Sequence, residues 1–214
     1  MAKLTFAGSL IVASTLAVLW NASATALAAD LQGNIPANRL AGNTYSSPDG
    51  NFVLTLPPLV MPGAKAQERR TGDVQIGVFF ADDFGNLYYV LRTDNTKMKY
   101  DLDKVAAGYT INDALREKEI VPTTRGSELR LAGILPGGSP IIRQTTVKGK
   151  TVQQNVNLHQ AMSLFLTDVY IFEVAAGVTG THQESDAELF ARAKQNLEAF
   201  LDGLRIKTDA PPRN

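Results

Sequence analysis

The most apolar stretch of the chain outside its N-terminus is AMSLFLTDVYIFEVAA, residues Ala161–Ala176. Alternate residues of an extended chain point to opposite faces, and in this stretch both sets are apolar. The even set is Met162, Leu164, Leu166, Tyr170, Phe172 and Val174, and the odd set is Phe165, Val169 and Ile171. A strand of this kind has to be covered on both faces, so we predict that it forms the centre of a layered sheet.

Further strands are predicted where apolar residues alternate between turn sequences. The first lies at Asn51–Pro57, after the turn Ser47-Pro48-Asp49-Gly50, in which the Pro presets φ and the final Gly tolerates a left-handed backbone. A tight turn at Thr167-Asp168 would divide the central stretch into Met162–Leu166 and Val169–Ala175. The other predicted strands are Ala64–Arg70, whose charges suit a sheet edge, Val74–Asp82, Leu87–Thr93, Ser127–Leu135, Ser139–Val147 and Val152–Gln160.

A terminal helix is predicted at Asp186–Leu204, where apolar residues recur at helical spacing. Ser185 precedes it as N-cap and Glu188 follows three positions later, which is the sequence of a capping box. The apolar stripe is Leu189, Phe190, Ala193, Leu197, Phe200, Leu201 and Leu204, and the opposite side carries Lys194, Gln195 and Glu198. We expect this helix to cover one face of the central stretch.

A middle helix is predicted at Asp101–Ile120, which begins with a helical spacing of apolar residues. The phase of those residues then slips, so the segment is either one bent helix or two short helices broken near Gly108. Pro122 would end it. Together these elements predict an α+β fold: an antiparallel sheet of about seven strands with helices packed on its faces.

The domain organisation follows from composition along the chain. A single α+β domain is predicted at 45–207. It is preceded by a flexible lead-in at 29–44, which lacks periodicity and is rich in Asn, Gly and Ala. The polar, proline-containing tail at 208–214 is expected to be disordered.

Residues 1–28 have the features of a secretory signal peptide. Lys3 supplies the positive start, Leu4–Leu19 is apolar or small throughout, and an A-x-A site ends at Ala28. Cleavage is expected after Ala28, with cleavage after Ala29 as the alternative. The apolar run is shorter than the roughly 20 residues of a membrane-spanning helix. We therefore expect a periplasmic or secreted protein whose mature chain has no membrane span.

Composition narrows the possible chemistry. The chain of 214 residues has 21 Lys and Arg against 21 Asp and Glu, so no net field favours nucleic acid or an acidic membrane surface. It contains no Cys, which excludes a thiol nucleophile, a disulfide framework and a Cys-ligated metal. Export without disulfides fits a bacterial periplasmic or secreted protein that is held by its hydrophobic core.

The two histidines are the candidate catalytic or metal-ligating residues, because a hydrolytic triad would need one and a His-rich metal site both. His159 is predicted on the polar face of a strand beside Asn155 and Asn157, and is therefore expected to be solvated. We expect no metal, no cofactor and no catalytic residue.

His182 lies in a predicted loop with Glu184 and Asp186 nearby, which could bind a metal weakly, although helix-capping roles explain the acids equally well. Asp83-Phe84-Gly85 matches a kinase triplet but lacks the other kinase motifs, so we interpret it as a turn. Gly137-Gly138-Ser139 lies between predicted strands and is interpreted as a hairpin turn rather than a nucleophile elbow.

The two ends of the domain resemble the PsbP-like family, which includes DcrB-type envelope proteins. The domain opens with Tyr45, Asp49-Gly50, Phe52 and Leu56-Pro57, and it finishes with the segment from Phe200 to Ile206, FLDGLRI, where such proteins often end on F-x-x-S-hydrophobic. Gly203 occupies the position where these proteins usually have Ser. The resemblance implies the PsbP-like fold and a non-enzymatic role in binding, assembly or accessory work. No functional residues of the family match, so none are carried over.

The sequence leaves more than one function open. The first hypothesis is a non-enzymatic binding or accessory protein whose partner is an envelope protein or a small ligand. It predicts an exposed apolar or aromatic patch and no cluster of perturbed titratable groups. The alternative is a hydrolase or metal-dependent enzyme that uses His159 or His182 with nearby carboxylates. A third, structural possibility is that the edge strand Ala64–Arg70 pairs with a neighbouring subunit.

Overall fold

The computed structural model describes residues 35–36, 38–57, 65–71, 75–81, 86–135, 141–147, 150–180 and 184–207. Several predictions concern residues outside these ranges and stay predictions. They are the signal peptide at 1–28, the cleavage residues Ala28 and Ala29, the turns at 83–85 and 137–139, His182 and the tail at 208–214.

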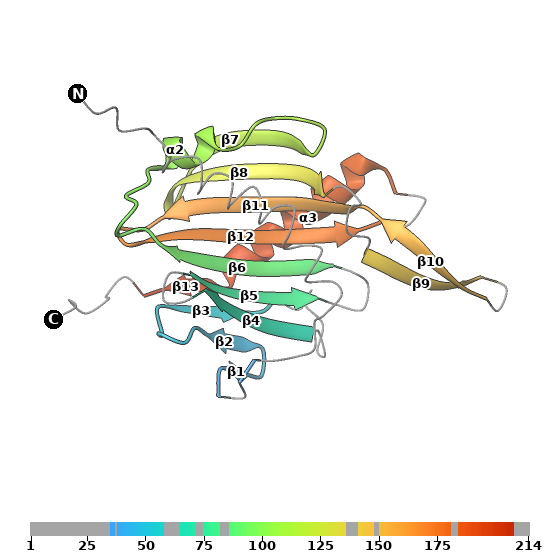
Figure 1. Ribbon diagram of the computed structural model, residues 1–214, viewed down its shortest axis with the longest axis horizontal. Coiled ribbons are helices and arrows are strands. Elements are labelled where there is room, and N and C mark those ends of the chain that lie inside the picture. The colour runs from blue at the N-terminus through green and yellow to red at the C-terminus, as the bar shows by residue number, and fades with distance from the viewer. Residues whose placement is uncertain are drawn as a thin grey trace, which may run out of the picture.

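Within the described residues, a seven-stranded antiparallel sheet forms the body of the protein (Figure 1). In spatial order its strands are β4 (Lys65–Thr71), β5 (Gln75–Ala81), β6 (Leu87–Asp94), β12 (Tyr170–Thr179), β11 (Leu158–Leu166), β8 (Gly126–Leu135) and β7 (Leu115–Thr123). The predicted α+β fold with a sheet of about seven strands is confirmed. The charged strand β4 lies at an edge of this sheet, as predicted.

The central stretch forms β11 and β12, which pair as a hairpin in the middle of the sheet. β12 is buried along its whole length, and β11 is buried up to its last residue, Leu166. Both faces are apolar, as predicted, but the even positions share a face only within each strand. Met162 pairs with Ala175, and Phe165 with Phe172, so even residues of one strand stand opposite odd residues of the other. The hairpin turn causes this exchange.

A smaller sheet has four short strands in the described residues: β1 (Leu40–Ala41), β2 (Thr44–Ser46), β3 (Phe52–Thr55) and β13 (Leu204–Ile206). β2 and β3 pair as a hairpin around the predicted turn, in which Gly50 has a φ of 69°, a conformation that favours glycine. The prediction of a flexible lead-in at 29–44 was wrong at its end, because β1 lies inside it and Leu40 pairs with Tyr45.

A two-stranded sheet of β9 (Ile141–Val147) and β10 (Lys150–Val156) projects from the body of the protein (Figure 1). The predicted strand Val152–Gln160 was wrong as a single element. Asn157 separates β10 from β11, and His159 belongs to β11. The alternation of side chains therefore does not run continuously from Val152 to His159.

The terminal helix is confirmed as α3 (Asp186–Asp202), with the predicted capping box. The Ser185 hydroxyl accepts a hydrogen bond from the Glu188 backbone N–H at 3.3 Å, and the Glu188 carboxylate accepts one from the Ser185 backbone N–H at 2.8 Å. The helix ends at Gly203, where a Cβ would lie 2.0 Å from the Thr55 carbonyl oxygen. This close approach explains why glycine stands there.

The middle helix was predicted far too long. α2 spans only Leu102–Ala107, and the Asp101 side chain caps it by accepting a hydrogen bond from the Lys104 N–H at 2.8 Å. Residues 115–123 are strand β7, and Pro122 lies inside this strand instead of ending a helix. The break in the helical spacing of apolar residues marked this change from helix to strand. An edge strand accommodates both the charged run at 116–119 and the proline.

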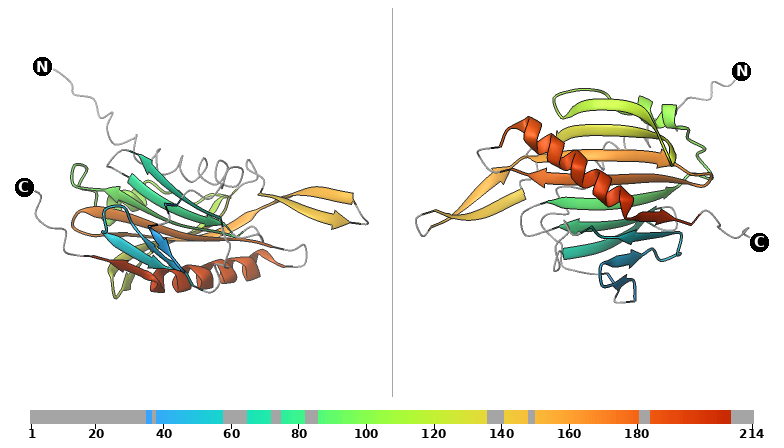
Figure 2. Two further views of the ribbon diagram at one scale, coloured as in Figure 1. Left: turned by 90° about the horizontal axis from the view of Figure 1, so that it is seen from below. Right: turned by 180° about the vertical axis from the view of Figure 1, so that it is seen from behind.

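Two hydrophobic layers pack on opposite faces of the main sheet. Figure 2 shows the terminal helix α3 lying across one of these faces. On the first face, the layer includes the α3 residues Leu189, Ala193, Leu197, Phe200 and Leu201. On the second, Val105 and Ala106 of α2 pack with Tyr109 against sheet residues such as Tyr89 and Leu164. We call these the α3 face and the α2 face.

Candidate functional site

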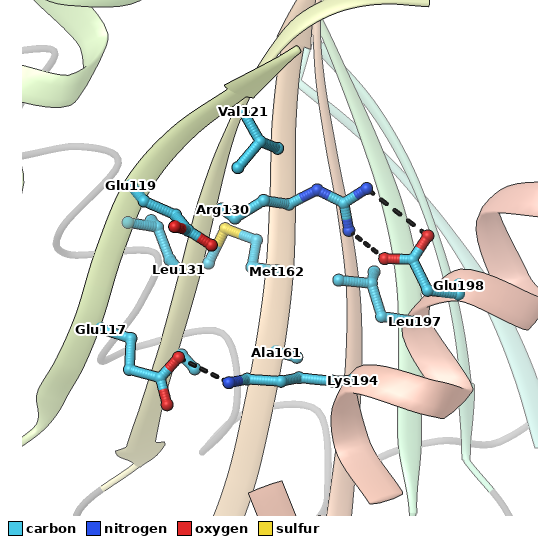
Figure 3. Close-up of a pocket in the computed structure, with 11 residues that line it drawn as sticks. Glu117, Glu119, Val121, Arg130, Leu131, Ala161, Met162, Lys194, Leu197 and Glu198 are labelled. Carbon is cyan, nitrogen blue, oxygen red and sulfur yellow. Dashed lines mark hydrogen bonds and ion pairs between the residues drawn. The ribbon is translucent and has the colours of Figure 1, made fainter. Parts of the chain in front are cut away.

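A groove lies on the α3 face, between α3 and the strands at the β7 edge of the sheet (Figure 3). Its volume is about 240 Å³. It is lined by Glu117, Glu119, Val121, Arg130, Leu131, Ala132, Ala161, Met162, Lys194, Leu197 and Glu198. We call it the α3 groove.

The α3 groove exists because small side chains meet beside the helix. Glu117 of β7 pairs with Ala132 of β8, and Ala132 pairs with Ala161 of β11. Cross-strand partners point to the same face, so the two alanines lie side by side under the groove. Farther along the same row of the sheet, Tyr88 and Phe80 fill the corresponding space. The alanines leave this space open.

Two ion pairs cross the α3 groove (Figure 3). Lys194 Nζ lies 2.6 Å from Glu117 Oε2, and Arg130 Nη1 lies 2.5 Å from Glu198 Oε1. Glu119 stands directly across from Arg130 in the sheet but makes no ion pair with any residue that the structure describes. The lining therefore holds three carboxylates against two cations, and Glu119 is the carboxylate without a bonded cation.

Glu128 lies next to Arg130 on the α3 face and is completely buried. One carboxylate oxygen accepts a hydrogen bond from Ser163 Oγ at 2.8 Å and lies 2.8 Å from Arg130 Nη2. The other accepts hydrogen bonds from Thr123 Oγ1 at 2.9 Å and Arg125 Nε at 2.8 Å. Burial acts to raise the pKa of Glu128, but these hydrogen bonds and the Arg130 charge outweigh it and hold the pKa below its usual value.

Glu173 of β12 is a second buried glutamate, on the α2 face between Leu91 and Leu164. Its Oε1 accepts a 2.5 Å hydrogen bond from the Tyr89 hydroxyl, and its Oε2 has no hydrogen-bond partner among the described residues. Burial raises the pKa of Glu173 to about 7, and the Tyr89 hydrogen bond opposes this only in part. Burial and the Glu173 charge also raise the pKa of Tyr89 and of Tyr109.

The Glu173 cluster contradicts one detail of the binding-protein hypothesis, which predicted no group of perturbed titratable residues. The cluster is enclosed, and Glu173 is 5% exposed. Neither Glu173 nor Tyr89 lines the α3 groove. A catalytic acid has to reach its substrate, so burial argues against a role in chemistry at the groove.

His159 is 3% exposed, so the prediction of a solvated histidine was wrong. Its predicted strand neighbours do not share its face, because Asn155 belongs to β10 and Asn157 separates the strands, while His159 lies in β11 on the face that α3 covers. His159 Nε2 lies 2.9 Å from Asp186 Oδ1 in the first turn of α3. The Phe190 ring packs edge-on against the imidazole, with the two ring centroids 5.0 Å apart. Its Nδ1 has no hydrogen-bond partner among the described residues, so no described hydroxyl completes a Ser-His-Asp arrangement.

The exposed large hydrophobic residues within the described part of the chain are Ile111 and Ile120, at 53% and 44% exposure. Ile120 lies in β7, and Ile111 lies in the segment that leads into it. The predicted exposed apolar surface is therefore small, and it does not line the α3 groove, because Ile120 pairs with Leu129 on the α2 face.

Neither a metal-binding cluster nor a membrane-spanning helix is found in the part of the chain that the structure describes. No group of three or more His, Asp or Glu side chains that could hold a metal ion occurs among the described residues. In the same part of the chain, no helix combines the length and the apolar character that crossing a membrane requires.

Sequence reasoning missed the residues of the α3 groove. Glu117 and Glu119 fell within the predicted middle helix, and Ala132 and Ala161 carry no chemical group that would single them out. The signal that could have revealed β7 was the sequence after Leu115. Its charged residues and Ile120 do not fit the buried face of a helix, but they suit an edge strand.

No protein-family model and no curated protein matches the chain. Among solved structures, the solution structure of cyanobacterial PsbP (CyanoP) from Synechocystis sp. PCC 6803 is 10% identical with a TM-score of 0.45, and the match covers 83% of this chain and 100% of that one. A crystal structure from Bacteroides thetaiotaomicron is 12% identical with a TM-score of 0.39. That match covers 78% of this chain and 49% of the other, so the chain spans about half the length of that protein. The chain thus has a weak, fold-level resemblance to PsbP.

Proposed function

We propose that the protein is an exported, non-enzymatic binding or accessory protein, and that the α3 groove with the adjoining β7 edge is its binding surface. The observation that carries this proposal is the make-up of the groove. Two alanines and Leu197 form an apolar hollow, and a small number of charged groups surround it. Concave sites with apolar walls and a few placed polar groups are typical of ligand-binding surfaces.

The charged groups at the α3 groove support binding over catalysis. Lys194 is paired with Glu117, and Arg130 is shared between Glu128 and Glu198. Groups held in this way neutralise one another. The groups suited to acid–base chemistry, His159 and Glu173, are buried and do not line the groove.

The β7 edge supports a protein as the partner. An edge strand presents unpaired backbone N–H and C=O groups, which another chain can bind by adding a strand. Glu119 and Val121 of β7 line the groove, while Ile120 between them offers an exposed apolar contact on the opposite, α2 face of the same strand. A partner that contacts β7 would thus also reach the α3 groove.

Site-specific photo-crosslinking in the native host tests this surface. A photoreactive residue placed at Glu119 or Val121 should capture one recurrent partner, whereas one at Lys99, which is exposed in the turn between β6 and α2, should not. Ala132→Leu should fill the hollow and reduce capture. The variant should still be folded, as shown by a cooperative thermal melting curve. Equal capture at Lys99 and Glu119, or no capture at the groove positions, would overturn the proposal.

Export has its own test, because the signal peptide is a prediction from sequence. The intact mass of the protein recovered from the periplasm or medium should correspond to a chain that begins at Ala29, or at Asp30 if cleavage follows Ala29. Recovery of the chain from the cytoplasm with residues 1–28 still attached would contradict export.

A further inference from the structure

We propose that the α3 groove receives the side chain of a lysine or arginine from a partner protein, with the charged end at Glu119 and the aliphatic stem over Ala132 and Ala161. This inference rests on the proposed function and specifies the chemistry of the partner at the same site.

The charge balance of the groove selects a cation. Lys194 and Arg130 already bond to Glu117 and Glu198, at 2.6 and 2.5 Å. Glu119 is the lining carboxylate that lacks such a partner among the described residues. An anionic ligand would meet this charge unfavourably, whereas an ammonium or guanidinium group would complete a third ion pair.

The shape of the groove suits a single side chain. Its volume of about 240 Å³ is below the usual range for drug-sized ligands, which begins at roughly 300 Å³. The alanine methyl groups and Leu197 offer an apolar surface, along which the methylene stem of Lys or Arg packs while its charged end stays near water.

One of the two crossing ion pairs allows entry. Glu117 and Lys194 are 51% and 48% exposed, whereas Arg130 of the other pair is only 18% exposed. Exposed pairs of this kind contribute little to stability, so they can open and exchange partners. The rim can therefore open for a basic side chain that reaches Glu119.

A protein, in preference to a free amine, is indicated by the surroundings of the groove. The β7 edge strand runs past both ends of the groove, whose β7 residues are Glu117, Glu119 and Val121. A free small cation would leave the backbone groups of this edge without a partner strand, whereas a peptide segment can pair with β7 while it inserts one basic side chain.

The test is an NMR titration of the exported protein, purified with labelled alanine methyl groups. The probe is the peptide acetyl-Gly-Leu-Arg-Leu-Gly-amide, and the matched probe replaces Arg with the neutral isostere citrulline. We expect saturable shifts at the Ala132 and Ala161 methyl groups, with binding about fivefold weaker for the citrulline peptide, as for a partly exposed ion pair. In Glu119→Gln the two peptides should bind alike, whereas Asp103→Asn on α2, which removes the same charge elsewhere, should keep the preference.

The outcomes separate this inference from the proposed function. Equal binding of the two peptides to the unaltered protein would overturn the cation site but leave the groove as a binding surface. Acetyl-arginine amide alone should bind more weakly than the peptide, and equal affinity would overturn a protein side chain as the source. If neither peptide shifts Ala132 or Ala161, the cation site fails, and the crosslinking result decides the proposed function separately.

Discussion

Glu128 and Glu173 occupy strands on either side of β11, and both are buried, but on opposite faces of the sheet. On the α3 face, Glu128 accepts hydrogen bonds from two hydroxyl groups and contacts two arginines, and its pKa is lowered. On the α2 face, Glu173 accepts one hydrogen bond from Tyr89, and its pKa is raised to about 7.

The comparison teaches that loss of solvent access alone does not fix the charge of a carboxylate. Burial disfavours the charged form of both residues, but Glu173 lies deeper and has one donor, whereas Glu128 has several donors and two cations that outweigh its burial. Glu128 lies at the β7 end of the sheet, where Arg125 and Arg130, with side chains 29% and 18% exposed, reach it. Glu173 lies in the central strand among apolar residues. Four predictions test this account.

The largest effect is expected for Glu128→Ala. Removing the carboxylate leaves Ser163 without its acceptor and Arg130 partly uncompensated in a buried network, which typically costs about 3–5 kcal/mol. Urea denaturation at pH 7 measures this change in the free energy of unfolding. Glu119→Ala is the control on an exposed strand position and should change stability by at most ~0.5 kcal/mol. A loss below ~1 kcal/mol for Glu128→Ala would show that the network is not strongly stabilising.

Glu173→Gln should change the pH dependence of stability. The pKa of Glu173 is raised from 4.5 to about 7 on folding, so the folded state holds the proton more tightly than the unfolded state. The contribution of Glu173 to the free energy of unfolding should be greatest below about pH 4.5, fall by about 3 kcal/mol as pH rises to about 7, and then level off.

The Gln variant cannot lose that proton. It should match the unaltered protein near pH 4 and be more stable by about 3 kcal/mol at pH 8, as measured by urea denaturation across this range. The opposite trend is expected from Glu128, whose lowered pKa makes its contribution disappear as pH falls. Parallel pH profiles for Glu173→Gln and the unaltered protein would contradict a neutral Glu173.

Tyr89→Phe should increase the difference in pKa between Glu173 and Glu128, with a smaller effect on stability than the two substitutions above. The Tyr89 hydroxyl favours the charged form of Glu173, so its removal should raise the pKa of Glu173 further. The loss in stability should be about 1–2 kcal/mol above pH 7, where Glu173 is ionised, and smaller at pH 4. Carbon-13 NMR of the Glu173 carboxyl group gives the pKa directly. A lower pKa in Tyr89→Phe would reverse the assigned role of the hydrogen bond.

The smallest effect is expected for the exposed pair of Lys194 and Glu117. A double-mutant cycle with Lys194→Ala and Glu117→Ala should give a coupling energy below ~1 kcal/mol, because both groups are about half exposed. Guanidinium chloride would screen the pair, so urea is the suitable denaturant. A coupling comparable to the effect of Glu128→Ala would mean that the rim of the α3 groove is rigid and does not open for a ligand.

Much of the fold was predictable because it depends on local patterns. The capping box of Ser185 and Glu188, the Gly50 turn and the two-faced apolar stretch all appear in the structure as predicted. The prediction of a long middle helix failed because the helical spacing of Leu102, Val105 and Ala106 fits only the short α2, while residues 115–123 obtain their backbone hydrogen bonds by pairing with β8. Such pairing involves residues distant in sequence, and local propensity does not reveal it.

The candidate site was far less predictable than the fold. Ala132 and Ala161 form a hollow only because β8 and β11 pair in a particular register and α3 leaves the β7 edge uncovered. His159 was assigned to solvent because its predicted strand neighbours are polar, although α3 packs over its side chain. Both errors arise from contacts across the sheet and between layers.

By itself the sequence determined the helix caps, the turns, the central position of Ala161–Ala176 and the absence of thiol chemistry, because each depends on residue type and short-range spacing. Tertiary structure alone decided which face α3 covers, which glutamate is ionised and where the groove lies. These properties depend on how many donors, charges and side-chain volumes converge at one point from distant parts of the chain. For Glu128 and Glu173 the residue type is the same, and the packed surroundings make the difference.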